Sequence, residues 1–155
     1  MTLLDRTDRA IVALMQEDAR RSNKELAAAV GIAASTCSER LRRLEDAGIL
    51  RGYTADVDPA ALGIGMRAIL AIRLRRHNAS EVDTFREHVL SMPEVVQVSH
   101  VTGGNDFLVQ VVVRDAAHLR DLAVSGFTSL PEVAHIETSL VFDHVAKPNL
   151  PDLAG

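Results

Sequence analysis

Hydroxyl and basic side chains alternate with apolar ones between residues 33 and 47, the part of the chain with the clearest capacity for chemistry. If residues 34–47 form a helix, steps of 100° place Cys37, Leu41 and Leu44 on one inward stripe. Polar groups then point outward: Ser35, Glu39, Arg42 and Asp46, flanked by Thr36, Ser38 and Arg43. Hydroxyl groups suit phosphates, and arginine suits a phosphate or the acceptor edge of guanine. For a helix considered alone, a solvated face with a Glu39–Arg43 ion pair is the better explanation.

A second candidate is the segment Thr102-Gly103-Gly104-Asn105-Asp106, in which two consecutive glycines precede an amide and an acid. Taken alone, Gly-Gly-Asn is what a tight hairpin uses, because these residues tolerate positive φ. On the residues by themselves we therefore favour a purely structural turn.

The remaining reactive side chains indicate no catalytic or metal site. Cys37 is the only cysteine, so no internal disulfide can form, and its inward position favours a buried thiol over a nucleophile. Six histidines are scattered without metal-ligand spacing: His77, His88, His100, His118, His135 and His144. We expect neither a metal nor a cofactor.

The length and bulk composition fit a globular protein of one medium domain or two small ones. The 155 residues are 47% hydrophobic but only 3% aromatic, so the cores must be built from aliphatic side chains. A net charge of −4 argues against non-specific coating of nucleic acid, although a local patch can still bind a specific sequence. The N-terminus lacks the apolar segment of a signal peptide, and no apolar run is long enough to span a membrane. We expect a reducing, cytoplasmic location.

Three helices are predicted in the first third of the chain. One covers residues 5–17 with Asp5 as its cap, and a capping box from Ser22 to Glu25 begins the second. Gly31 ends that helix and Gly48 ends a third, over residues 34–47. Residues 49–57 look like a strand and form a possible wing. Residues 22–47 thus have the layout of a helix-turn-helix, and this setting makes DNA binding the better explanation of the outward polar face.

The second half contains a faint repeat, in which residues 91–95 recur as residues 129–133. A strand and then a helix precede each copy. Before the first copy, the strand covers residues 66–74 and the helix starts near Glu81 with Ser80 as its cap. Before the second copy, the strand covers residues 107–113 and the helix starts at Asp115. The order predicts a ferredoxin-like βαββαβ domain, α+β in class, with helices on one face of an antiparallel sheet. The other face would expose apolar side chains, namely Ile69, Ala71, Val101, Leu108 and Val112, which favours dimerisation through the sheet. The predicted organisation is a DNA-binding domain (1–58), a linker (59–65), a regulatory and oligomerisation domain (66–145) and a tail (146–155).

Several segments resemble one family closely. They are Leu4-Asp5-Arg6-Thr7-Asp8-Arg9-Ala10-Ile11, Asn23-Lys24-Glu25-Leu26-Ala27, Gly31-Ile32, residues 40–53, Asp58-Pro59 and Leu62-Gly63. This pattern is similar to the Lrp/AsnC, or feast/famine, transcriptional regulators. The resemblance spans nearly the whole chain.

The resemblance implies a winged helix-turn-helix, dimers that assemble into tetramers or octamers, and an amino acid or related metabolite as effector. The expected partners are double-stranded DNA, a small effector and further copies of the chain. DNA contacts are expected from the second and third helices: Asn23, Lys24, Ser35, Thr36, Ser38, Glu39, Arg40, Arg42 and Arg43. In this family a Gly-rich loop ending in an acid borders the effector pocket, which assigns Thr102, Gly103, Gly104, Asn105 and Asp106 to the effector. Backbone N–H groups there can hold a carboxylate, and Asp106 can accept from an ammonium group.

One departure from the family concerns the start of the recognition helix, where Ala33 and Ala34 replace the usual Ser and Pro. Either the cap shifts to Ser35 or that helix end is less stable by about 1 kcal/mol.

Two other functions fit the same architecture. Tetrapyrrole decarboxylases resemble it but need basic and histidine side chains in the regulatory domain and need not keep a DNA-binding face. A partner that does not bind DNA would have lost the outward arginines. Arg42 and Arg43 are present, so we favour a regulator and expect no enzyme activity.

Overall fold

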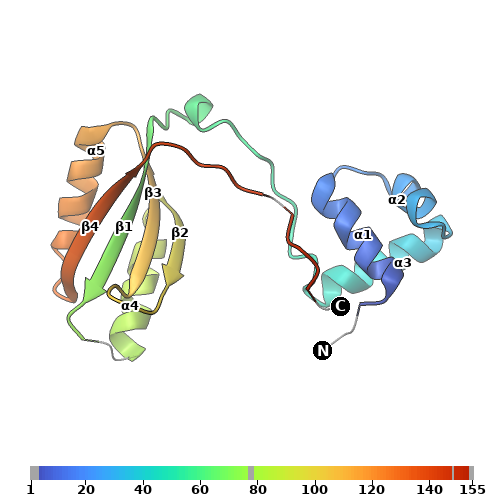
Figure 1. Cartoon of the computed structure of the whole chain (residues 1–155), viewed down its shortest axis with the longest axis horizontal. Coiled ribbons are helices and arrows are strands. Elements are labelled where there is room, and N and C mark those ends of the chain that lie inside the picture. Colours follow the sequence, from blue (N-terminus) through green and yellow to red (C-terminus); the bar gives the residue numbers. More distant parts are fainter. Residues whose placement is uncertain (1–3, 77–78, 148, 154–155) are drawn as a thin grey trace. The chain divides into compact units, whose positions relative to one another are not determined.

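The computed structural model describes residues 4–76, 79–147 and 149–153. Contacts within the chain define two compact units, one made of Met1–Asp56 with Val145–Gly155 and the other of Val57–His144 (Figure 1). His77, for which no metal role was expected, lies outside the described residues.

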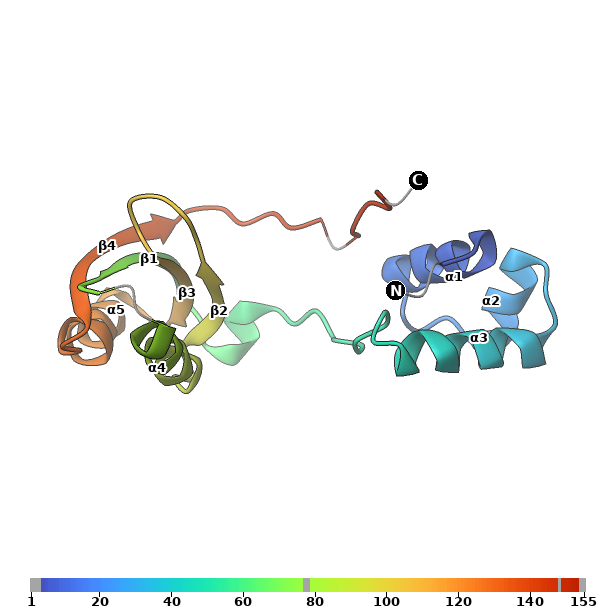
Figure 2. The same cartoon turned by 90° about the horizontal axis from the view of Figure 1, so that it is seen from below.

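The first unit is built on three helices, α1 (Arg6–Glu17), α2 (Asn23–Val30) and α3 (Ala34–Asp46), as the sequence predicts (Figure 2). Their apolar faces meet in a core that includes Ile11, Leu26, Cys37 and Leu44, each at most 1% exposed. Capping boxes begin α1 at Asp5 and α2 at Ser22. Gly31 ends α2 with a left-handed φ of 73°, which lets the chain turn directly into α3.

The prediction of a strand over residues 49–57 is wrong, because the structure has no strand in this segment. Its residues pair with no other strand, and a strand needs a partner for its backbone groups. The segment is instead attached to α3 by a side chain, because the Tyr53 hydroxyl donates a hydrogen bond of 2.8 Å to Glu45 Oε1. A short 3₁₀ turn, η1 (Pro59–Leu62), capped by Asp58, follows.

The second unit is a four-stranded antiparallel sheet with helices on one face, which confirms the predicted fold class. The strands are β1 (Met66–Leu74), β2 (Val95–His100), β3 (Phe107–Val113) and β4 (Val133–Val141), in the order β2-β3-β1-β4. The central pairing aligns Leu70 with Val109 on one side and with Thr138 on the other. This is the order that two interleaved strand-helix-strand units produce.

Helices α4 (Ala79–Leu90) and α5 (Ala116–Asp121) cover one face of the sheet. Helix α4 begins at Ala79, so the prediction that Ser80 caps it is wrong, and Ser80 lies in the first turn. Helix α5 was predicted to start at Asp115 and begins one residue later, with Asp115 as its N-cap accepting from the His118 N–H at 2.8 Å. The following segment, η2 (Leu122–Thr128), is a π-helix that the sequence did not reveal.

The two faces of the sheet differ in burial. Alternate residues of β1 and β3, such as Leu70, Ile72 and Val109, are fully buried beneath the helices. On the opposite face Ile69, Ala71 and Val112 are half-buried and Leu108 is exposed, although all four are apolar. Val101 lies one residue beyond the end of β2.

The C-terminal segment is attached to α1 within the first unit. The Gln16 amide accepts from Leu150 N at 2.6 Å and donates to Leu150 O at 3.4 Å. About two turns earlier on α1, Arg9 forms an ion pair of 2.5 Å with Asp152. No helix in the described part of the chain is long and apolar enough to cross a membrane.

Candidate DNA-binding surface and effector site

Helix α3 presents a polar face to solvent, as its periodicity predicts. Cys37 and Leu44 are buried beneath it, and burial raises the pKa of the Cys37 thiol. The opposite side is exposed and carries Ser35, Thr36, Ser38, Glu39 and Arg42. Among the described residues, Arg42 has no hydrogen-bond or ion-pair partner, so its guanidinium group is available to another molecule.

Arg40 and Arg43 are held by α1 instead. The carboxylate of Asp8 accepts from Arg40 Nη1 at 2.8 Å and from Arg43 Nη2 at 2.6 Å. Arg40 also donates to Asp5 Oδ2 at 2.6 Å. This hydrogen bond lowers the pKa of Asp5, and the same bond raises the pKa of Arg40. The ordinary Glu39–Arg43 ion pair that was considered from spacing is replaced by this contact between helices.

Asn23 and Lys24 occupy the first turn of α2. The Asn23 amide donates to the backbone oxygen of Ala34 at 2.8 Å and so ties the start of α2 to the start of α3. Its Oδ1 atom is buried and has no hydrogen-bond partner among the described residues. Lys24 is exposed. Asn23 therefore has a positioning role whether or not it contacts DNA.

The recognition helix begins without a side-chain cap. Its N-cap is Ala33, so the cap does not shift to Ser35, and Ala33 contributes only its backbone oxygen, which accepts from Cys37 N at 3.0 Å. The first N–H groups of a helix have no partner within it and can bind an anion, and the exposed residues Ser35 and Thr36 lie in this first turn.

The loop Thr102–Asp106 connects β2 to β3 and is fixed at its acidic end. The Asp106 backbone donates to Ile72 O at 2.8 Å, and its carboxylate accepts from Leu74 N at 2.8 Å. Gly103 has a φ of 120°, a conformation that side chains rarely adopt, whereas Gly104 has an ordinary φ and nothing within 4 Å of where a Cβ would lie. Asp106 thus attaches the loop to the end of β1 and leaves the two glycines exposed.

Sequence reasoning missed two contacts beside these sites. His100 stacks on Phe107 next to the loop, with ring centroids 4.8 Å apart. Asp8 is the only buried acidic or basic side chain among the described residues, and its spacing from Asp5 was the available signal. His118 is bound to Glu94 at 3.1 Å, as expected for a structural histidine. The described residues contain no group of three side chains that could hold a metal.

Two families match the chain. Residues 4–51 match the family described as winged helix-turn-helix DNA-binding, and residues 67–150 match the Lrp/AsnC ligand binding domain. The HTH-type transcriptional regulator AldR of Mycolicibacterium smegmatis is 39% identical over 142 residues, which cover 92% of this chain and 83% of that protein. The leucine-responsive regulatory protein of Rhizobium meliloti is 34% identical over 142 residues, covering 92% and 91%.

Solved structures agree with the sequence matches. A transcriptional regulator of Neisseria meningitidis, crystallised as a complex with L-Met, superposes with a TM-score of 0.86 at 31% identity. The superposition covers 94% of each chain, so the likeness includes both units.

Proposed function

The chain belongs to the Lrp/AsnC family of transcriptional regulators, and on this basis we propose how its residues bind DNA, an effector and each other. The protein is a DNA-binding regulator with a ligand-binding domain, and its relatives are regulators rather than enzymes. Because the named relatives are bacterial, we place its action in the cytoplasm, where the chromosome lies.

Helix α3 enters the major groove of the operator in this proposal. The observation that carries it is the contrast among three arginines: Asp8 binds Arg40 and Arg43, whereas Arg42 is exposed and has no partner among the described residues. Arg42 then binds a base edge or a phosphate. The exposed hydroxyl groups of Ser35, Thr36 and Ser38 bind phosphates. Glu39, on the outward side of α3, and Lys24, in the first turn of α2, belong to the same surface.

The test uses an operator selected from random-sequence DNA by the wild-type protein. Arg42→Ala should weaken binding by about 1–3 kcal/mol if Arg42 contacts a base. Arg86→Ala serves as the control, because Arg86 lies on α4 and pairs with Asp83. Unchanged affinity in both Arg42→Ala and Arg43→Ala, with the fold intact by circular dichroism, would contradict this placement.

The effector, an amino acid or related metabolite, binds at the loop Thr102–Asp106. The exposed backbone of Gly103 and Gly104 can approach a ligand carboxylate closely, and Asp106 supplies negative charge for an ammonium group. The similar Neisseria regulator, whose structure contains L-Met, supports this class of ligand. Thr102 and Asn105 belong to the same loop and complete the proposed site.

Gly104 offers a clean test of the effector site. A Cβ atom at this position would have no neighbour within 4 Å, and we expect Gly104→Val to fold normally and to obstruct only a ligand. Calorimetry with L-alanine, L-leucine and L-methionine should show binding to the wild type and at least tenfold weaker binding at the loop in this variant and in Asp106→Asn. Equal affinities in all three proteins would show that the loop is only a turn.

The uncovered sheet face joins two copies into a dimer, which assembles further into tetramers or octamers. Its apolar side chains are Ile69, Ala71, Leu108 and Val112, which a second sheet would remove from water. Light scattering should show no stable 16.8 kDa monomer at micromolar concentration. Leu108→Glu should produce monomers, whereas Val124→Glu, on the helical side, should not. A dimer requires two half-sites about 10 base pairs or a multiple of that apart.

A further inference from the structure

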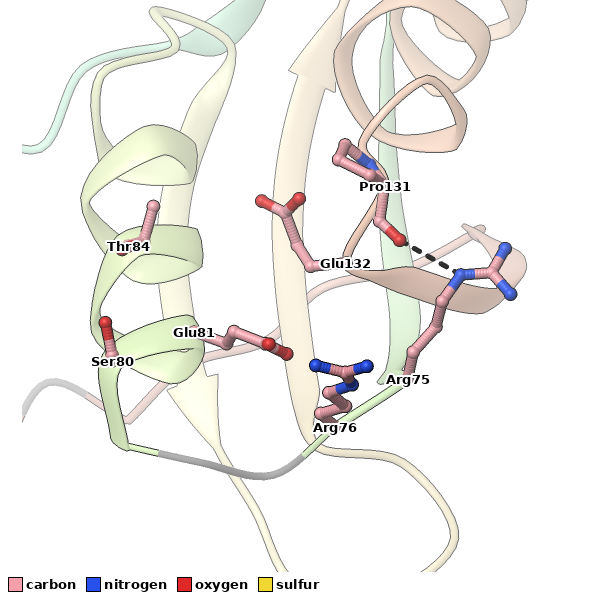
Figure 3. A pocket seen from close by; sticks show the side chains of 7 residues that line it. All are labelled: Arg75, Arg76, Ser80, Glu81, Thr84, Pro131 and Glu132. Carbon is pink, nitrogen blue, oxygen red and sulfur yellow. Dashed lines mark hydrogen bonds between the residues drawn. The ribbon is translucent and has the colours of Figure 1, made fainter.

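A second pocket lies within one chain, away from the loop Thr102–Asp106 (Figure 3). It has a volume of about 360 Å³, within the range of small-molecule sites. Its lining comes from the end of β1, the start of α4 and the turn before β4: Arg75, Arg76, Ser80, Glu81, Thr84, Pro131 and Glu132. None of the five loop residues assigned to the effector lines it.

Two hydrogen bonds fix the wall that joins β1 to the turn before β4. The backbone N–H of Arg75 donates to Glu132 O at 2.8 Å, and Arg75 Nε donates to Pro131 O at 3.0 Å. The second bond is drawn in Figure 3, where it holds the Arg75 side chain across the turn. Backbone and side chain together therefore hold this wall in place, so the hollow does not depend on the conformation of one mobile residue.

Four charged residues line the pocket on different walls: Arg75 and Arg76 after β1, Glu81 on α4 and Glu132 in the turn before β4. Arg76 lies two residues after the end of β1, and Glu132 lies in the turn before β4, so their charged groups come from different segments (Figure 3). Within the described part of the chain, neither Arg76 nor Glu132 has a hydrogen-bond or ion-pair partner for its charged group. Two opposite charges that border one hollow without pairing with each other can each bind the complementary end of a ligand.

We propose that this pocket binds a small zwitterion, an amino acid or a molecule with the same two charged ends. Arg76 binds the carboxylate, and Glu132 binds the ammonium group. The hydroxyl groups of Ser80 and Thr84 on α4 supply neutral hydrogen-bonding groups. Pro131 gives an apolar surface for the ligand's side chain.

The pocket and the effector loop share the end of β1. The N–H of Leu74 donates to the Asp106 carboxylate, and the next residue, Arg75, lines the pocket. The two sites are therefore attached to adjacent residues, Leu74 and Arg75. Ligand binding in the pocket does not depend on an effector site at the loop, because none of the charged residues that line the pocket belongs to the loop.

The experiment is calorimetry on the full-length protein with L-alanine, L-leucine and L-methionine as probes. Arg76→Gln and Glu132→Gln keep side-chain size and remove one charge each, and both should weaken pocket binding at least tenfold. Arg120→Gln is the control, because Arg120 is exposed on α5, pairs with its neighbour Asp121 and does not line the pocket. Gly104→Val should leave pocket binding intact while it removes binding at the loop, so failure at one site is distinguishable from failure at the other.

Probes that lack one charge test the assignment of ends. N-acetyl-L-methionine lacks the ammonium charge, so it should bind the wild type and Glu132→Gln with equal affinity. L-methioninamide lacks the carboxylate and should no longer distinguish wild type from Arg76→Gln. Three results would overturn the proposal: no binding of the amino-acid probes outside the loop, binding indifferent to both substitutions, or inorganic phosphate binding through Arg76 in place of the amino acids.

Discussion

The carboxylate of Asp8 lies 2.8 Å from the guanidinium group of Arg40, and the Asp8 side chain is only 2% exposed. Its other oxygen binds Arg43 at 2.6 Å, so one buried acid on α1 orients two arginines of the recognition helix. A polar contact of this kind fixes the direction of α3, whereas the apolar core beneath it fixes mainly the distance between the helices.

Replacing Asp8 with Asn should therefore destabilise the first unit more than an ordinary surface change does. The amide cannot accept from both arginines, and we expect a loss of about 2–3 kcal/mol in the free energy of unfolding. Urea titration followed by circular dichroism measures it. Glu17→Gln is the matched control, because it breaks the exposed Glu17–Arg21 pair and should cost less than about 0.5 kcal/mol. Similar losses in the two variants would mean that Asp8 adds nothing beyond a surface ion pair.

Ala33→Ser should stabilise the protein, because the N-cap of α3 has no side-chain hydrogen bond. A serine hydroxyl at that position can accept from a free N–H of the first turn, with an expected gain of about 1 kcal/mol. The urea midpoint should rise for this variant. Ala28→Ser, inside α2, should lower the midpoint slightly, since serine favours the helix interior less than alanine does. A midpoint that falls for both would show that the helix start is already satisfied by other means.

The first unit should lose stability in acid. A hydrogen bond from Arg40 lowers the pKa of Asp5 from 3.8, and the hydroxyl of Ser22 lowers the pKa of Glu25 from 4.5. The unfolded chain therefore takes up these protons first as the pH falls. The stabilisation is complete above the ordinary values and disappears as the pH drops through the lowered ones. Thermal unfolding from about pH 6 to pH 3 should show this decline.

Removing the two carboxylates by substitution tests whether they cause the loss of stability in acid. The double variant Asp5→Asn, Glu25→Gln should be less stable than the wild type near neutral pH. Below about pH 4.5 its stability should depend less steeply on pH. Asp56→Asn, which removes an exposed carboxylate with no described partner, should keep the wild-type slope. An unchanged slope in the double variant would assign the acid sensitivity to other groups.

Gly65 should tolerate no side chain. A Cβ there would lie 2.2 Å from the backbone oxygen of Arg114, an atom that cannot move without disturbing the end of β3. We expect Gly65→Ala to cost about 1–3 kcal/mol in the second unit. Gly104→Ala, with open space around its Cβ, should leave stability nearly unchanged. The two variants differ only in position, so equal stabilities would show that the chain relieves the contact at Gly65 without loss.

Local patterns predicted most of the elements. The alternation through Ala68, Leu70 and Ile72 and the apolar run from Phe107 gave both central strands with their bounds. Capping residues located α1 and α2 in the same way, because such signals lie within a few residues of the element they begin. The segment 49–57 also alternates, but a strand is formed by pairing, and its own unit supplies no neighbour.

The sites were predictable only in part. Periodicity identified the exposed face of α3 but could not separate Arg42 from Arg40 and Arg43, because the difference depends on Asp8, more than thirty residues away. Similarly, two glycines marked the loop, whereas the attachment of Asp106 to Leu74 depends on strand order. The pocket between α4 and the turn before β4 is lined by three segments that are separated in the sequence. Local sequence patterns cannot predict that these segments come together, because their contact depends on the fold.

The attachment of the C-terminal segment to α1 means that the DNA-binding unit is not one continuous stretch of sequence. A fragment that ends at residue 56 leaves Arg9 and Gln16 without Asp152 and Leu150. Measurements of DNA affinity therefore need a protein that retains Leu150 and Asp152.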